Sequence, residues 1–383
     1  MTVTLPPGPP HSADIEALIE AARRRQRRRR RLLALLVALV VIAGTAGYLV
    51  LGSAMSGHRA SGGPSRLGSG SSGAAIRLER PGALALGSGS VLYIADEGRN
   101  QILERLPNGT FRIVAGTGKA GFSGDGGPAV RAELNAPGGM AIARDGTLYF
   151  ADEGNGRVRA ITPDGIISTI AGNGKGDWVK SGTPAHAAPI VGPTAVTIGP
   201  DGHLYLAAGS NQVLRLETNE TLTQIAGSQQ YAGVRVHDGG RPAVNESPDD
   251  PSGLAFDRAG NLYLAGWAVK TLLMITPKGI MTRPAGIGNF YPRGKGGLVT
   301  APNGSVLAID TQAIVRLTPH GVVPIVDFSG KPLDGITAFL PQGIAVAPNG
   351  EIYTDTAVGN GWANKTALVM VRPGKKPRVL WKG

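Results

Sequence analysis

Short apolar runs recur through residues 80–383, and turn-forming residues separate them. In one representative stretch the apolar runs fall at residues 140–143, 148–151, 158–161 and 167–170, with turns such as Asp145-Gly146 between them. Short strands joined by Asn-Gly or Asp-Gly turns are typical of antiparallel hairpins. No run in this region has the spacing of an amphipathic helix. The pattern therefore predicts an all-β domain and excludes a doubly wound α/β fold.

The four-run pattern repeats six times, which indicates a repeat architecture. One position in the second run of each unit marks the register, and it is filled by Tyr93, Tyr149, Tyr205, Tyr263, Leu307 and Tyr353. Six four-stranded units in series predict a six-bladed β-propeller. We assign it to residues 78–383.

The repeating unit resembles the NHL repeat. The second unit matches the family pattern at Pro137, Gly139, Ala141, Gly146, Tyr149, Ala151, Asp152, Asn155 and Arg157. The resemblance covers about residues 80–383. It weakens in unit five, which lacks the Tyr, and in unit six, where Thr356 replaces the Asp. The resemblance implies a binding function, because NHL-like propellers serve as sensor domains of some bacterial receptor kinases.

The N-terminal part has a different pattern. Residues 32–52 form an uncharged apolar stretch, and eight Arg residues lie between positions 23 and 31. A stretch of about 20 apolar residues spans a bilayer, and cationic flanks stay cytoplasmic. We therefore predict a cytoplasmic tail (1–31), a transmembrane helix (32–52), a Gly/Ser-rich linker (53–77) and an extracytoplasmic propeller. The alternative is a cleaved secretory signal. A tail of 31 residues is too short for a kinase.

Propeller topology predicts where a ligand would bind. The loops between second and third strands emerge on one face together with the connections between blades, and these connections are long. We call this the loop face. Aromatic and charged side chains on exposed loops favour binding. The candidate ligand-binding residues are Trp178, Trp267, Trp362, Tyr231, Tyr291, Asp152 and Arg157. Phe122 and Phe290 lie in the same connections. The alternative is that these aromatics pack inward and hold their own loops.

The first long connection contains GTGKAGFSGDGGPA (residues 116–129), which includes a GxGxxG. Dinucleotide binding needs this motif between a strand and a helix, and here another strand follows. We therefore expect no nucleotide cofactor. Related sequences precede later blades at residues 182–185 and 238–243. The stretch is interpreted as a marker of blade junctions, with glycines for turns of positive φ and Asp125 bound to amides of its own loop.

The composition restricts the chemistry. The chain has no Cys, and its six His residues form no closely spaced pair, so no metal site is predicted. Asp96, Asp152 and Asp310 recur after the second strand. We interpret them as structural groups that bind their own loop or an Arg such as Arg157. The net charge of +12 arises in large part from the Arg cluster beside the apolar stretch, which does not indicate nucleic-acid binding.

Together these observations predict a membrane-anchored sensor or binding module, more readily than an enzyme. Its ligand would be a protein, a peptide or a cell-envelope glycan on the loop face. The alternative is an extracytoplasmic metal-dependent lactonase or lyase, because six-bladed propellers include such enzymes and place their metal at the mouth of the channel. No catalytic residue is assigned.

Overall fold

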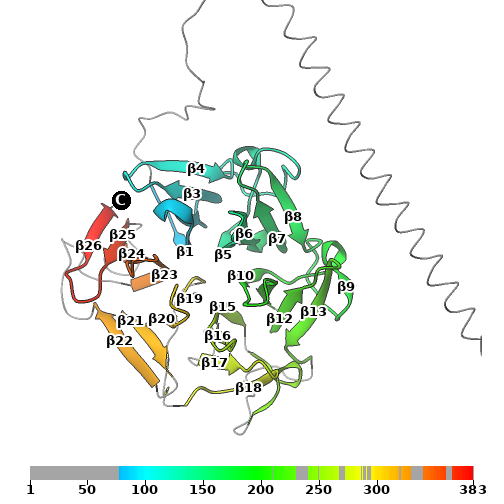
Figure 1. Ribbon diagram of the computed structural model, residues 1–383. Coiled ribbons are helices and arrows are strands. Elements are labelled where there is room, and N and C mark those ends of the chain that lie inside the picture. Colours follow the sequence, from blue (N-terminus) through cyan, green and yellow to red (C-terminus); the bar gives the residue numbers. More distant parts are fainter. Residues whose placement is uncertain are drawn as a thin grey trace, which may run out of the picture. The chain divides into compact units, whose positions relative to one another are not determined.

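The computed structural model describes residues 77–209, 211–229, 240–248, 250–266, 272–285, 287, 290, 295–318, 321–328, 340–358 and 365–382. All of them belong to one compact unit, Ser71–Gly383. The described residues form six antiparallel sheets arranged as blades around a central channel (Figure 1). The predicted six-bladed β-propeller is therefore confirmed.

Each blade uses four consecutive strands, which run outward from the channel in chain order (Figure 1). Blades 1–3 consist of β1 (Pro81–Leu86), β2 (Leu92–Asp96), β3 (Gln101–Arg105) and β4 (Phe111–Ala115); β5 (Pro137–Ile142), β6 (Leu148–Asp152), β7 (Arg157–Ile161) and β8 (Ile167–Ala171); and β10 (Pro193–Ile198), β11 (Leu204–Ala208), β12 (Gln212–Leu216) and β13 (Thr221–Ala226).

Blades 4–6 repeat this arrangement. They consist of β15 (Pro251–Phe256), β16 (Leu262–Gly266), β17 (Leu272–Ile275) and β18 (Ile280–Thr282); β19 (Leu298–Thr300), β20 (Val306–Asp310), β21 (Ala313–Thr318) and β22 (Gly321–Asp327); and β23 (Leu340–Val346), β24 (Ile352–Val358), β25 (Lys365–Val371) and β26 (Arg378–Lys382). Short 3₁₀ turns lie at η1 (Ser88–Ser90) and η3 (Glu153–Asn155).

The hydrophobic core is divided among the interfaces between neighbouring blades. One cluster combines Val158 and Ala171 of blade 2 with Leu206 of blade 3, and another combines Ala207 of blade 3 with Leu264 of blade 4. The second strands contribute small residues to these interfaces, and Ala95, Ala151 and Ala207 are fully buried. Such small side chains let adjacent twisted sheets approach closely, which packing to interior density requires.

The ring closes between blade 6 and blade 1 by side-chain packing. Sheet 1 contains only strands from the start of the propeller and sheet 6 only strands from its end, so no strand is shared. Leu84 and Ile94 of blade 1 pack with Tyr353 and Leu368 of blade 6. The Thr366 hydroxyl also donates a hydrogen bond of 3.2 Å to the Leu78 carbonyl.

Three long connections between blades form a repeated structure that we call the strap. After leaving one blade, the chain runs along the outer edge of the next blade and forms a 3₁₀ turn there before it enters the first strand. The straps contain η2 (Ala129–Arg131), β9 (Thr183–Pro184) with η4 (Ala185–Ala187), and β14 (Arg241–Pro242) with η5 (Ala243–Asn245). The two short strands pair with β13 and β18 as fifth strands, and Pro128 forms a bridge with Ile166 beside β8.

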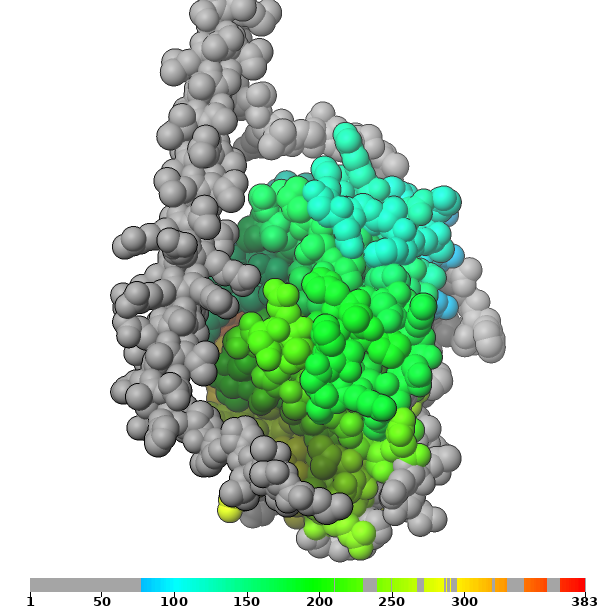
Figure 2. Space-filling model, turned by 90° about the vertical axis from the view of Figure 1, so that its right-hand side faces the viewer, coloured from blue at the N-terminus to red at the C-terminus, as the bar shows by residue number. Residues whose placement is uncertain are grey.

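Equivalent hydrogen bonds hold the three straps. The amides of Ala129, Ala185 and Ala243 donate to Gly165, Glu220 and Gly279 in the outer hairpins of blades 2, 3 and 4. Figure 2 shows this outer side of the ring for blades 2 and 3. These connections were predicted to lie on the loop face. They begin and end there, but their middle parts cover the blade edges, where unpaired backbone groups of the outer strands need partners.

The interpretation of GTGKAGFSGDGGPA as a junction is confirmed. Gly116, Gly118, Gly124 and Gly126 all have positive φ, between 79° and 94°. A Cβ on Gly116 would lie 2.3 Å from the Asn100 carbonyl oxygen, so only glycine fits this close approach.

Within the residues that the structure describes, no helix has the length and apolarity that crossing a bilayer requires. The predicted span 32–52, like the tail and most of the linker, lies outside these residues.

Candidate functional site

The loop face of blade 2 contains a buried arginine at its centre. Arg159 on β7 has no solvent exposure, and its Nη2 donates hydrogen bonds of 2.8 Å to both the Ser123 carbonyl and Asp125 Oδ1. Its Nη1 lies 3.2 Å from the Glu133 carbonyl and 3.4 Å from Asp152 Oδ2. Arg159 therefore joins the strap connection to the blade that this connection covers.

Arg159 occupies a position that is apolar in the other blades. The residue paired with the second strand at this point is Leu103, Leu214, Leu273, Val315 or Val369 in blades 1, 3, 4, 5 and 6. A buried arginine costs desolvation energy unless its charge and its donors are matched. Arg159 was not among the predicted site residues, although an Arg at a position that holds Leu or Val in the other blades can be recognised in the sequence.

Phe122 and Arg157 form the exposed part of the same cluster. The Arg157 guanidinium lies 3.7 Å from the centre of the Phe122 ring, and that of Arg159 lies 5.1 Å away. Arg157 also donates hydrogen bonds to the carbonyls of Asn155 and Asn173, which fix its plane. Phe122 still retains 41% of its exposure. The result is an aromatic ring held in place on an open surface, which is a favourable geometry for cation–π contact.

Asp152 and Asp125 have different partners from those expected. Asp152 is fully buried, and it accepts hydrogen bonds from the Asn135 amide and the Asn155 side chain as well as from Arg159. Burial raises the pKa of Asp152, and these donors oppose the rise. Its arginine partner is therefore Arg159 and not Arg157. Asp125 does not bind its own loop amides, but accepts from Arg159 and from the Thr169 hydroxyl.

Two of the three repeated Asp residues, Asp96 and Asp152, make structural contacts of the predicted kind. Asp96 in blade 1 accepts hydrogen bonds of 2.9 Å from the amides of Glu79 and Arg80, in the segment that leads into β1. Asp152 holds the Asn135 amide in the equivalent segment of blade 2. In both blades the carboxylate anchors the entering chain to the loop that follows the second strand.

A lysine crosses the channel mouth on the loop face. Lys295, in the connection between blades 4 and 5, forms ion pairs with Glu97 of blade 1, at 3.1 Å, and with Glu153 of blade 2. Burial would lower the pKa of Lys295, but the two carboxylates outweigh burial and raise it. Burial also raises the pKa of Glu97, against the effect of Lys295. The Lys295 ammonium thus lies between the two carboxylates and pairs with both.

No cluster of three or more metal-binding side chains occurs among the described residues. His203, on the opposite face, lies 3.3 Å from Asp201 and 3.8 Å from Glu217, and Arg215 lies 3.7 Å from the same Asp201 carboxylate. These contacts connect the turn before β11 with the end of β12 in blade 3.

The other candidate residues fall into two groups. Trp178 is partly buried in the connection after blade 2, and its amide donates a 2.7 Å hydrogen bond to Asp177. Trp178 lies a few residues after Asn173, whose carbonyl accepts a hydrogen bond from Arg157. Tyr231, Tyr291, Trp267 and Trp362 lie outside the described residues. Phe290 is 1% exposed and packs between blades 4 and 5, so for this residue the inward-packing alternative is correct.

Comparison with known proteins supports the NHL assignment. The sequence profile of the teneurin NHL domain matches residues 104–265. Teneurin-3 of Mus musculus is 29% identical over 191 residues, which cover 46% of this chain and 7% of teneurin-3. Teneurin-4 of Mus musculus is 41% identical over 97 residues, covering 22% and 4%. The chain therefore spans less than a tenth of these relatives, and the similarity concerns an NHL-type six-bladed β-propeller.

Solved structures agree on the fold. A gluconolactonase from Xanthomonas campestris superposes with a TM-score of 0.50 at 12% identity, covering 74% of this chain and 84% of that protein. A second structure, described as a candidate gluconolactonase, gives 0.51 at 15% identity, covering 73% and 86%. At such identities the likeness extends to the fold alone.

Proposed function

We propose that this chain is a membrane-anchored binding or sensor module. Residues 32–52 would cross the membrane with the Arg-rich tail in the cytoplasm, which the apolar stretch and its cationic flank support. Residues 53–77 would tether the propeller outside the cytoplasm. The propeller would recognise a protein, a peptide or a cell-envelope glycan on its loop face.

One observation carries this proposal: the exposed Phe122 ring is held by two arginines. Arg159 occupies a buried position that is apolar in the other blades, and it hydrogen-bonds to the loop that carries Phe122. Both guanidinium groups lie near the Phe122 ring, and that of Arg157 covers one side of it. A side chain already fixed in place loses little conformational entropy on binding, so pre-organisation increases affinity. Aromatic and arginine side chains also contribute most to binding energy at interfaces.

The face around Phe122 favours a ligand with an aromatic or apolar surface. Trp178 lies in the same connection as Asn173, whose carbonyl accepts a hydrogen bond from Arg157. The charges of this face are nearly balanced, because Asp125, Asp152 and the exposed Asp177 oppose Arg157, Arg159 and Lys175. Recognition here would therefore depend on the aromatic rings and not on net charge.

The lactonase or lyase alternative is supported by fold similarity alone. Such an enzyme would need three or more polar ligands converging on a metal at the channel mouth. Among the described residues, Glu97 and Glu153 lie at that mouth and Lys295 pairs with both, while Asp250 lies close enough to interact electrostatically with Glu153 and Lys295. Binding through the loop face is accordingly the function that the geometry supports best.

The test is ligand capture with the full chain from cell-envelope extracts. We expect Phe122→Ala and Trp178→Ala each to weaken retention of the captured ligand at least tenfold, because each change removes an aromatic contact. Ile113→Ala is the matched control, since Ile113 is 43% exposed but lies on β4 at the outer edge. It is expected to retain the ligand fully.

The same purified chain should be assayed for bound metal. Stoichiometric metal together with no captured ligand would overturn the binding-module proposal and favour the enzyme. A reporter fused after Gly383 tests the topology separately, because activity only in the cytoplasm would contradict an extracytoplasmic propeller.

A further inference from the structure

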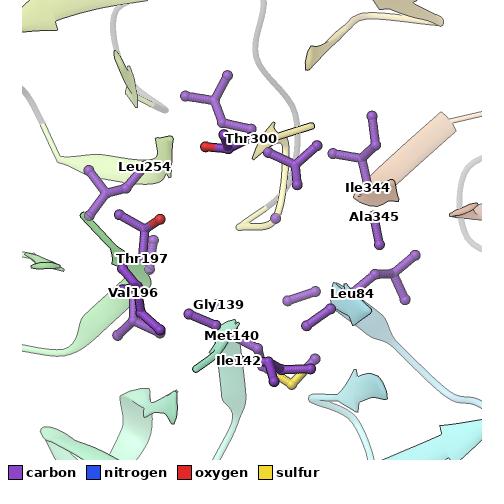
Figure 3. A pocket seen from close by; sticks show the side chains of 18 of the residues that line it. Leu84, Gly139, Met140, Ile142, Val196, Thr197, Leu254, Thr300, Ile344 and Ala345 are labelled. Carbon is purple, nitrogen blue, oxygen red and sulfur yellow. The ribbon is translucent and has the colours of Figure 1, made fainter. Parts of the chain in front are cut away.

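The channel through the propeller encloses a cavity of about 360 Å³. Its wall is formed by the first strands of all six blades, and the side chains are mainly aliphatic: Leu84, Met140, Ile142, Val196, Leu254 and Ile344. Figure 3 shows these side chains around an open centre. Cavities of about 300–1,000 Å³ with apolar walls and few polar groups are typical of small-molecule sites.

The loop-face end of this cavity is narrow. Here each first strand begins, and a Cβ on Gly139 would lie 2.6 Å from the Ala195 Cα. Gly296 bridges to Gly343 of blade 6, and a Cβ on it would lie 3.1 Å from the Ala83 Cα of blade 1. Lys295 then reaches Glu97 and Glu153. The connection between blades 4 and 5 therefore crosses this mouth.

The opposite end of the cavity is wider and reaches solvent. Along β5 the first three residues are buried and the last three are partly exposed, and β10 shows the same change over its last two residues. On β19 exposure rises from the buried Leu298 to the exposed Thr300. These strands end at the tight turns of the face opposite the loop face, which we call the turn face. The cavity thus opens on the turn face.

The polar side chains of the wall are few, although each first strand is the inner edge of its sheet and also presents backbone groups to the channel. The Thr300 hydroxyl donates to the Phe256 carbonyl at 2.8 Å and accepts from the Phe256 amide at 3.1 Å. Asp257, at the turn-face end, accepts from the amides of Ala259 and Asn261. Thr197 is partly exposed and borders the cavity (Figure 3). A ligand here would meet aliphatic side chains, backbone groups of the first strands and one hydroxyl at its entrance.

We propose that the channel is a binding site for one compact aliphatic molecule that enters from the turn face. Its hydrocarbon part would lie among the first strands, and a hydroxyl or similar neutral polar group would stay near Thr197. This site is independent of the loop face, so either proposal can fail while the other holds. It differs from a metal site at the channel mouth because its wall is aliphatic and it lies beyond Lys295.

The first test titrates linear alcohols of increasing length, from butanol to dodecanol, into the purified full chain by calorimetry, with carrier buffer as the blank. We expect one molecule per chain. Each added methylene should increase affinity roughly fourfold, the value for burial of a CH₂ group. Affinity should stop rising at the length that fills the cavity. Unsaturable uptake, or a gain that continues to dodecanol, would overturn the proposal.

Two variants at one position locate the site. Thr197→Phe should fill the entrance and weaken binding of the best alcohol at least tenfold. Thr197→Ser keeps the hydroxyl and adds no bulk, so it should change affinity less than threefold. Val130→Phe is the control, because Val130 is 47% exposed on the strap outside the channel. Unchanged binding by a folded Thr197→Phe chain would refute the site. If that variant does not fold, the titration of the natural chain decides, through the alcohol length at which affinity stops rising.

Discussion

Blades 2–4 and blade 5 consist of the same four strands, but their outer edges differ. Blades 2–4 each receive a strap from the preceding connection, and these connections occupy residues 116–136, 172–192 and 227–250. The connection before blade 5, residues 283–297, is shorter. In the described residues its outer strand β22 has no fifth strand, and Val322 and Val323 are 36% and 40% exposed.

The difference shows what the long connections contribute to stability. Each strap buries alanines and provides backbone partners at an edge that would otherwise be exposed to other chains. Blade 2 adds a polar centre, Arg159, to its strap. Blade 6 carries a buried polar group of another kind. Asp355 is 1% exposed and its Oδ1 accepts from the Gly343 amide, while its Oδ2 has no hydrogen-bond partner among the described residues.

The largest expected effect comes from replacing Arg159 in blade 2 by the apolar residue that the other blades have at this position. Arg159→Leu removes the cation that faces the fully buried Asp152, and breaking a buried pair in this way costs about 3–5 kcal/mol. Urea unfolding would measure the loss. Leu214→Met, at the same position of blade 3, is the control and should cost under about 1.5 kcal/mol. Equal losses would show that Arg159 has no special role.

Asp355→Asn should instead increase the free energy of unfolding, by an amount that depends on pH. Burial raises the pKa of Asp355 from 3.8 to about 7. Between these values the folded chain keeps a proton that the unfolded chain has released, so stability from this group falls as pH rises. Relative to the natural chain, the free energy of unfolding of the variant should be higher by up to about 4 kcal/mol at pH 8 and unchanged below pH 4. Thermal unfolding across this range tests it.

A pH-independent difference between the two chains would contradict the assignment to Asp355. Asp257→Asn is a suitable control, because Asp257 accepts hydrogen bonds in an exposed turn and no comparable gain is expected there.

A smaller effect is expected within one strap. Ala129 is 1% exposed against blade 2, whereas its neighbour Val130 is 47% exposed. Ala129→Leu would overfill the contact and should cost about 1–3 kcal/mol. Val130→Leu should change stability by less than about 0.5 kcal/mol. Proteolysis at the strap, followed with urea unfolding, would separate the two. If both variants behaved alike, the strap would not be packed against the blade as described.

Much of the fold follows from local pattern. The register position lies in the second strand of each blade, as predicted, and it holds a Tyr in five blades and Leu307 in blade 5. The tight turns and the positive-φ glycines of the first junction were also predicted correctly. These features depend on residues close together in the chain, for which turn chemistry and strand periodicity are sufficient.

The contacts of the candidate site were harder to predict from the sequence than the fold. Asp152 and Arg157 were identified as a group, but Arg157 lies over Phe122 and Asp152 pairs with Arg159. Periodicity marks position 159 as buried, and a buried arginine contradicts ordinary burial preferences. Its partner Asp125 lies 34 residues earlier, in a loop whose path the pattern does not specify.

The amino-acid sequence by itself determined the six blades, their register and the uncharged stretch at residues 32–52. The tertiary structure decided which junction loops become straps, which carboxylates Arg159 matches, and that Lys295 crosses the channel to Glu153 from 142 residues away. The physical reason is that strands and turns are specified by neighbours in the chain. Straps, buried ion pairs and the aliphatic channel arise only when the ring brings distant segments together.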